Sequence, residues 1–261
     1  MRRSDVSQIR DLPLFSDMSA AHFESLVSAA LLQKFPEGIT LIHEGEAPDF
    51  LHVIVDGTIE LFANWQGRET TIDIVRPVTT FILAAVVRDE VYLKSARTLA
   101  PSRILLLPAE AVRDVFGRDA AFARSIVNEL AARYRSVVRV LKDHKLRTGI
   151  ERLANWILQE NRLQGRHGRV KLSYEKRKLS ARLGMTPENL SRNLASLSLH
   201  GISISGHEIS IVDRNALLAL AKPHTLIDGS DAHRDDLITV SLPLSTPSTS
   251  NLLRRKRILR S

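Results

Sequence analysis

Apolar side chains between residues 123 and 141 recur at alternating intervals of four and three residues. The positions are Ala123, Val127, Leu130, Tyr134, Val137 and Leu141. This spacing places them along one narrow stripe of an α-helix about 30 Å long, at roughly 1.5 Å per residue. The stripe can pack on the chain's own domain, but a strict 4-3 spacing is narrower than an ordinary amphipathic face. We therefore expect it to form a seam between two copies of the chain.

The residues before this helix have the pattern of a β domain. Short runs rich in Val, Ile and Leu occupy residues 50–55, 58–63, 70–75 and 103–108, with turn signals between them. Strands of this length and spacing, within a region that is β from about 40 to 108, predict a sandwich or a small barrel. A short helix is expected ahead of them, at residues 20–32.

The residues after the stripe predict a second, basic domain. We place the hinge at residues 143–147, and Thr148 with Glu151 has the spacing of a capping box that opens a helix through about Gln159. Residues 142–228 carry 15 Lys/Arg and 8 Asp/Glu, a net charge of +7, whereas the preceding part is slightly acidic. Such a segment indicates a polyanionic partner, nucleic acid first. The alternative is a solvated basic face without a partner.

The basic domain contains the order of elements that is typical of a winged helix-turn-helix. A helix at 175–183, a glycine turn and a helix at 187–198 are followed by residues 202–212, which alternate around Gly206-His207 as a β-hairpin does. We divide the chain into a β domain (10–117), a long helix (118–143), a winged helix domain (148–228) and a disordered tail (229–261), which is an α+β architecture.

Several classes of protein and site are excluded or disfavoured. The chain has no cysteine, which excludes disulfides, cysteine nucleophiles and cysteine-bound iron–sulfur clusters. It has no phosphate loop, no HExxH and no G-x-S-x-G, so we expect neither an enzyme nor a metal site. The charged N-terminus is not a signal peptide, and no segment is apolar enough to span a bilayer. We therefore expect a cytoplasmic protein with no membrane partner.

The second helix of the predicted motif has two different sides. Leucines at i, i+4 and i+7 form its apolar stripe, and Glu188, Ser191 and Arg192 lie on the other side. A helix of this kind enters the major groove, where arginine donates to guanine, glutamate accepts from cytosine and serine serves either way. We predict that these three residues read bases. An exposed i, i+4 ion pair between Glu188 and Arg192 is the alternative.

Other residues of the basic domain are predicted to contact DNA phosphates. The first helix of the motif supplies four cations, the second helix supplies its capping residue, and the hairpin supplies a histidine. These residues are Lys176, Arg177, Lys178, Arg182, Thr186 and His207.

Together these features resemble the Crp/Fnr family of bacterial transcription regulators. The resemblance rests on TLIHEGEAPDFLHVIVDGTIEL (40–61), on the long helix and on E-N-L-S-R (188–192), and it covers roughly residues 10–228. It implies a cyclic-nucleotide-binding-type β jelly roll, a dimerisation helix, a winged helix-turn-helix, double-stranded DNA as ligand and RNA polymerase as partner. The serine before Arg192 resembles the Fnr-like branch, whose half-sites are of the TTGAT type.

The resemblance also implies an effector pocket, which is degenerate in this chain. The corresponding residues are Leu83, Ala84, Lys94 and Ser95. Leu83 and Ala84 replace the glycine and the ribose-binding glutamate, and Lys94 replaces the phosphate-binding arginine and lacks its bidentate fork. We therefore do not expect useful binding of cyclic AMP.

The cofactor and the wider role stay open at this point. His22, His43 and His52 leave a haem sensor as an alternative, and a regulator without effector is equally compatible. A ligand-binding regulatory subunit that acts on a protein would explain the β domain and the stripe. It would leave the basic winged helix unexplained.

Overall fold

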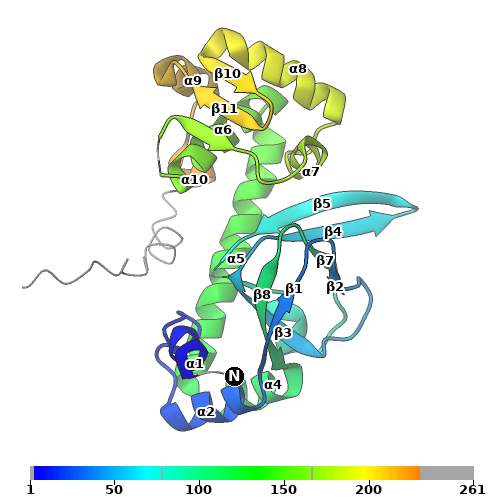
Figure 1. Ribbon diagram of the computed structural model, residues 1–261, viewed down its shortest axis with the longest axis vertical. Helices are drawn as coiled ribbons and strands as arrows, with labels where there is room; N and C mark the ends of the chain where they lie inside the picture. Colours follow the sequence, from blue (N-terminus) through cyan, green and yellow to red (C-terminus); the bar gives the residue numbers. More distant parts are fainter. Residues whose placement is uncertain (1–2, 78, 166, 230–261) are drawn as a thin grey trace, which may run out of the picture.

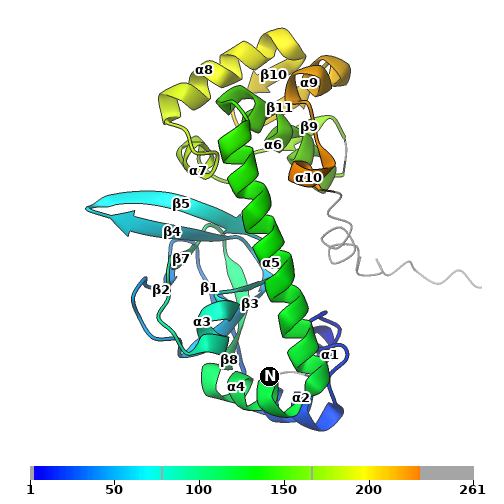
Figure 2. The same ribbon diagram turned by 180° about the vertical axis from the view of Figure 1, so that it is seen from behind.

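The computed structural model describes residues 3–77, 79–165 and 167–229 of the 261-residue chain. A β-rich domain lies at one end of helix α5 (Ala120–Leu146), and a smaller domain lies at its other end (Figure 1). The view from behind shows α5 running along the β domain and reaching the smaller one (Figure 2). The tail expected at 229–261 lies outside the described residues from position 230 onward.

Eight antiparallel strands of the β domain form two four-stranded sheets. The first has the order β1 (Leu31–Phe35), β8 (Ser102–Pro108), β3 (Phe50–Asp56) and β6 (Thr79–Phe81). The second has the order β2 (Thr40–Ile42), β7 (Ser95–Thr98), β4 (Ile59–Trp65) and β5 (Arg68–Val75). The four strands expected from the sequence are confirmed as β3, β4, β5 and β8.

Strand β8 contains four consecutive apolar residues, at positions 104–107, because both of its faces are buried. Leu105 and Leu107 belong to a core cluster that also contains Phe122 of α5. Ile104 and Leu106 belong to a second cluster, to which both sheets contribute. The β domain is therefore a sandwich whose first sheet is covered by helices.

Four helices of the β domain are short. They are α1 (Arg3–Arg10), α2 (Ala20–Ser28), α3 (Leu83–Arg88) and α4 (Ala109–Arg118). The helix expected through residue 32 is wrong at its end, because residues 31–35 pair with β8. The expectation of β structure throughout 40–108 is also wrong, because α3 interrupts it.

Helix α5 is anchored at its start by Asp119. The carboxylate accepts hydrogen bonds from the N–H groups of Ala121 and Phe122 within the helix, and from the N–H of Ser19 at the start of α2. The bond from Phe122 is the main cause that holds the pKa of Asp119 well below its usual range, and the bond from Ser19 acts in the same direction. Phe122 and Ile126 are fully buried against the β domain, so the first half of α5 belongs to that domain's core.

The C-terminal domain contains the winged helix-turn-helix. Its elements are α6 (Gly149–Leu163), β9 (Arg169–Lys171), α7 (Lys176–Arg182), α8 (Pro187–Leu197), the 3-10 turn η1 (Ser198–His200), β10 (Ile202–Ser205), β11 (Glu208–Ile211), α9 (Arg214–Ala221) and α10 (Thr225–Asp228). Both hydrogen bonds of the Thr148–Glu151 capping box are present. Strands β10 and β11 pair across Gly206, which has a φ of +58°, so the expected hairpin is confirmed.

A histidine buried in the β domain makes stability depend on pH. Burial lowers the pKa of His52 to about 4, and its ring lies 4.9 Å from that of Phe81. The unfolded chain takes up this proton near pH 6.5, so the folded state loses stability as pH falls from about 6.5 towards 4. Between pH 7 and pH 5, we expect the unfolding free energy of the natural chain to fall by about 2 kcal/mol more than that of the His52→Gln variant. Urea unfolding at both pH values checks this, and equal losses contradict it.

Candidate nucleic-acid interface

Helix α8 begins with the cap that its sequence predicts. The hydroxyl of Thr186 accepts a hydrogen bond from the N–H of Asn189 at 3.2 Å. Pro187 occupies the first helical position, where an N–H would have no intrahelical acceptor. The buried leucines on one side of the helix are Leu190, Leu194 and Leu197. The helix therefore has a defined start and a defined inner face.

The leucines of α8 attach it to the other helices of its domain. They share one core cluster with Leu153 and Ile157 of α6, and with Leu179 and Leu183 from α7 and its end. Burial of each leucine contributes about 1.5–3 kcal/mol. Because α6 and α7 hold this face, the opposite face of α8 is presented outward.

The outward face of α8 carries the three residues predicted to read bases. Glu188, Ser191 and Arg192 are all exposed. The Nη2 atom of Arg192 donates a hydrogen bond to Oδ1 of Asn189 at 2.6 Å, which turns the guanidinium towards the start of the helix. Sequence reasoning did not single out Asn189, although its position three residues before Arg192 is the signal that would have found it.

The chemistry of this face suits the edges of base pairs. The backbone N–H of Glu188 and the hydroxyl of Thr186 hydrogen-bond to the Glu188 carboxylate and, with the charge of Arg192, lower its pKa. Glu188 therefore offers only acceptor oxygens, while Arg192 offers a fork of donors that matches guanine O6 and N7.

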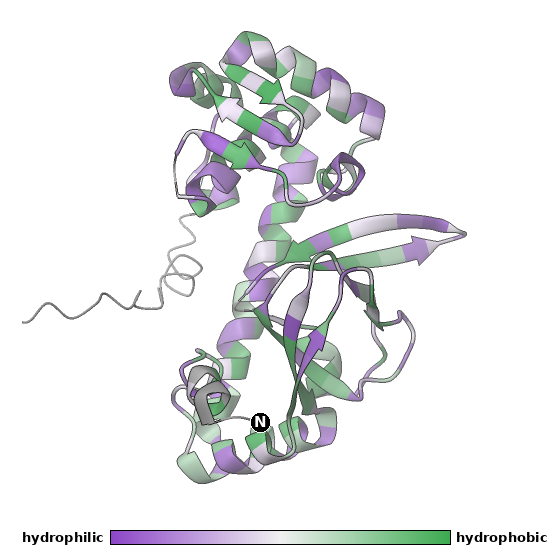
Figure 3. Cartoon of the chain, viewed as in Figure 1, coloured by the Kyte–Doolittle hydropathy of each residue, from purple (hydrophilic) through white to green (hydrophobic). Residues whose placement is uncertain are grey.

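The residues predicted to contact phosphates lie in two places. Lys176 and Arg177 on α7, the cap Thr186, and His207 in the turn of the hairpin are exposed. Figure 3 shows α7 as mostly hydrophilic. Lys178 and Arg182 instead form ion pairs with the β domain. Only the first set is open to a duplex in this arrangement, because Lys178 and Arg182 lie one turn apart on the side of α7 that faces β5.

The residues of the expected effector pocket differ in their burial and in their hydrogen bonding. Leu83 is buried in the core cluster beneath α3, and Ala84 is exposed. Ser95 is buried, and its hydroxyl accepts a hydrogen bond from the N–H of Glu44 at 2.9 Å. Burial lowers the pKa of Lys94, although the charge of Asp73 opposes that shift.

The three histidines considered for haem binding are in different surroundings. His22 lies 2.9 Å from Asp119, with its ring near the start of α5. His43 is exposed just after β2, and His52 is buried within β3. Within residues 3–77, 79–165 and 167–229, no group of three or more His, Asp or Glu side chains is placed to hold a metal ion.

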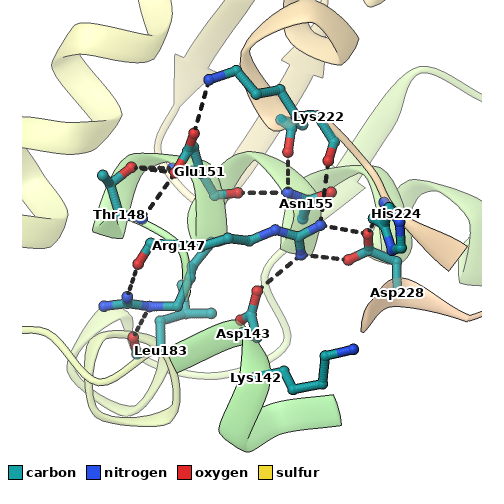
Figure 4. A network of polar contacts seen from close by, with 12 residues as sticks. Lys142, Asp143, Arg147, Thr148, Glu151, Asn155, Leu183, Lys222, His224 and Asp228 are labelled. Carbon is teal, nitrogen blue, oxygen red and sulfur yellow. Dashed lines mark hydrogen bonds and ion pairs between the residues drawn. The ribbon is translucent and has the colours of Figure 1, made fainter. Parts of the chain in front are cut away.

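Helix α10, the last helix of the described residues, is hydrogen-bonded to the junction between the two domains. Helix α5 continues through Leu146, so the hinge expected at 143–147 is helical except for Arg147. Arg147 donates hydrogen bonds to Asp143 at 2.9 Å and to both oxygens of Asp228 at 2.6 Å (Figure 4). The Asp228 carboxylate is the main cause that raises the pKa of Arg147. Helix α10 is thereby tied to the end of α5.

No helix in the described ranges combines the length and the apolar character that a bilayer crossing requires.

Two family profiles match this chain in the order of its domains. The profile described as "Cyclic nucleotide-binding domain" matches residues 32–119, and the one described as "Crp-like helix-turn-helix domain" matches residues 151–220. Between them they cover more than half of the chain.

Known transcription regulators are similar to this chain in sequence or in fold. The "CRP-like cAMP-activated global transcriptional regulator" of Mycobacterium tuberculosis is 24% identical over 194 residues, which cover 72% of this chain and 87% of that protein. FixK2 from Bradyrhizobium japonicum has the same fold, with a TM-score of 0.66 at 20% identity over 75% of this chain and 98% of that one. A CRP-family transcriptional regulator from Thermus thermophilus has a TM-score of 0.61 at 20% identity, over 73% of this chain and 97% of that one. The chain belongs to the Crp/Fnr family of DNA-binding transcription regulators.

Proposed function

We propose that the chain is a homodimeric, sequence-specific regulator that reads a palindromic site of the TTGAT type through α8. The observation that carries this proposal is the division of α8 into a face of buried leucines and an exposed face with Glu188, Ser191 and Arg192. An acid, a hydroxyl and a guanidinium on one exposed helix face supply the groups that base edges require. The family evidence points to transcription regulators, which as a class are not enzymes.

The proposal of a dimer is supported by apolar side chains that α5 leaves in solvent. Tyr134 is 70% exposed and Val137 is 65% exposed, and Val127 and Leu141 of the same stripe are also exposed. Ala123 is partly buried, as is Leu130, which packs on the core of its own β domain. A second copy would cover the exposed part of this stripe and place two recognition helices about 34 Å apart.

The experiment that tests the proposal is a gel shift at several salt concentrations. One duplex carries two inverted TTGAT-type half-sites, and the other carries the same bases in scrambled order. We expect tighter binding to the palindrome. We also expect the logarithm of the association constant to fall by about 0.9 per neutralised phosphate for each tenfold increase in salt concentration. Equal affinities for the two duplexes contradict sequence-specific reading. Absence of binding to both favours the alternative of a regulatory subunit that acts on a protein.

We further propose that this regulator does not respond to cyclic AMP, although the Mycobacterium tuberculosis relative is described as cAMP-activated. Leu83 is buried, exposed Ala84 carries no acceptor for a ribose hydroxyl, and the hydroxyl of Ser95 is already bonded to the backbone of Glu44. We expect calorimetric titration with cyclic AMP to show no binding at micromolar concentrations. A micromolar or smaller Kd contradicts this. RNA polymerase as a partner and a cytoplasmic location stay predictions.

A further inference from the structure

Helix α7 carries cations on two opposite sides. Lys176 is exposed, whereas Lys178 and Arg182 face the hairpin of β4 and β5. At about 100° per residue, Lys176 lies opposite Lys178, and Arg182 lies one turn further on the same side as Lys178. Figures 1 and 2 both show α7 beside the β4–β5 hairpin.

Lys178 is bound to a carboxylate that water scarcely reaches. Its Nζ atom lies 2.6 Å from Oε2 of Glu60, whose side chain is 1% exposed. Arg97 of β7 donates to the same oxygen at 2.6 Å, and Thr71 donates to Oε1 at 2.5 Å. Burial alone would raise the pKa of Glu60, but the hydrogen bonds from Arg97, Lys178 and Thr71 hold it below its usual range. Moving Lys178 to a phosphate would remove a partner from a buried charge, which is unfavourable.

Further contacts extend the same interface. Arg182 lies 3.4 Å from Asp73 of β5. In a further ion pair the β domain supplies the cation and the C-terminal domain supplies the carboxylate. Arg76 of the β domain lies 3.0 Å from Glu160 of α6, and Glu160 is buried.

Ile74 of β5 is buried in the core cluster of the C-terminal domain. Leu99, between β7 and β8, packs against the same cluster. The two domains therefore meet through apolar side chains flanked by ion pairs.

We propose that Lys178 and Arg182 are positioning residues, which hold the winged helix domain on the β4–β5 hairpin and do not contact DNA phosphates. Glu188 and Arg192 stay exposed in this docked arrangement, so docking leaves the reading face of α8 free. Docking fixes the direction of α8 relative to the β domain. In a dimer, docking also fixes the orientation of the two recognition helices relative to each other.

The same contacts connect the DNA-binding domain to a strand of the expected effector pocket. Arg97 bridges Glu60 and Glu69, and it lies on β7, the strand that also carries Ser95. A shift of β7 would therefore change the partners of Lys178 directly. The β4–β5 hairpin is therefore one place, besides α5, where the β domain can influence α8.

The experiment compares Lys178→Met with the matched variant Lys176→Met, on the same helix two residues away. Operator affinity is measured over a salt series. The salt slope is the slope of the logarithm of the association constant against the logarithm of the salt concentration. We expect Lys176→Met to reduce the magnitude of this slope by about 1, as loss of one phosphate contact does. We expect Lys178→Met to leave the slope unchanged and to weaken binding at least about fivefold at every salt concentration. A slope reduced by about 1 in Lys178→Met contradicts the proposal.

A second readout needs no DNA. The chain has no cysteine, so spin labels can be placed at Arg68→Cys on β5 and Ser196→Cys on α8, both exposed. The labelled protein is diluted with unlabelled protein, and the distance distribution is measured by pulsed electron resonance. We expect a broader distribution in Lys178→Met and in Arg182→Met than in Lys176→Met, and equal widths contradict the proposal. The affinity effect rests on the proposed function, but this measurement tests docking even where the protein binds no DNA.

Discussion

Replacing Arg192 with alanine is expected to weaken binding to the operator by about 5- to 150-fold, which corresponds to about 1–3 kcal/mol. The side chain is exposed on the outward face of α8 and is turned by Asn189 rather than held in the protein core. Its removal therefore costs little folding stability and removes a bidentate donor. Discrimination at one base pair of each half-site should be lost, and quantitative footprinting on the operator and on single-base variants measures both effects.

The matched control for this prediction is Arg192→Lys. Lysine retains the positive charge but lacks the planar fork. We expect this variant to keep most of its affinity for scrambled duplex and to lose the same base discrimination as Arg192→Ala. Unchanged affinity of Arg192→Ala for the operator would show that α8 does not read bases through this residue.

Placing a carboxylate in the exposed stripe of α5 should prevent dimerisation. Val137 is 65% exposed in the single chain, so Val137→Asp leaves the protomer's own core intact. In a dimer the substitution buries two unpaired charges, which costs several kcal/mol. We expect the dimer dissociation constant to rise at least about 100-fold in sedimentation equilibrium, with loss of operator binding.

The chain offers a close control for that substitution. Ala132 is also exposed on α5 but lies on the side of the helix opposite the stripe. Ala132→Asp introduces the same charge and costs more helix propensity than Val137→Asp, because alanine is a better helix former than valine. We nevertheless expect it to remain dimeric. If both variants behave alike, the stripe is not the dimer seam.

The parts of the fold that local rules determine could be predicted from the sequence. The cap at Thr186, the capping box at Thr148 and the hairpin turn at Gly206 each depend on residues a few positions apart, and the structure contains all three. The four longer strands were also predicted. Strands β2 and β6 have only three residues each, which is too short for an alternating pattern to appear.

The contacts between distant segments could not be predicted in this way. Helix α10 has four residues and is fixed by the bonds between Asp228 and Arg147, 81 positions apart. Lys178 and Arg182 read as ordinary basic residues of a DNA-binding helix. Only the position of the β4–β5 hairpin beside α7 shows that they face Glu60 and Asp73.

The measurement that tests sequence-specific reading most directly is selection of duplexes from a random library by the purified full chain. We expect two inverted half-sites of the TTGAT type, with centres one helical turn apart, to be enriched. Recovery of duplexes without any common sequence, at affinities set by salt alone, would contradict the assignment of α8 as a reader of bases.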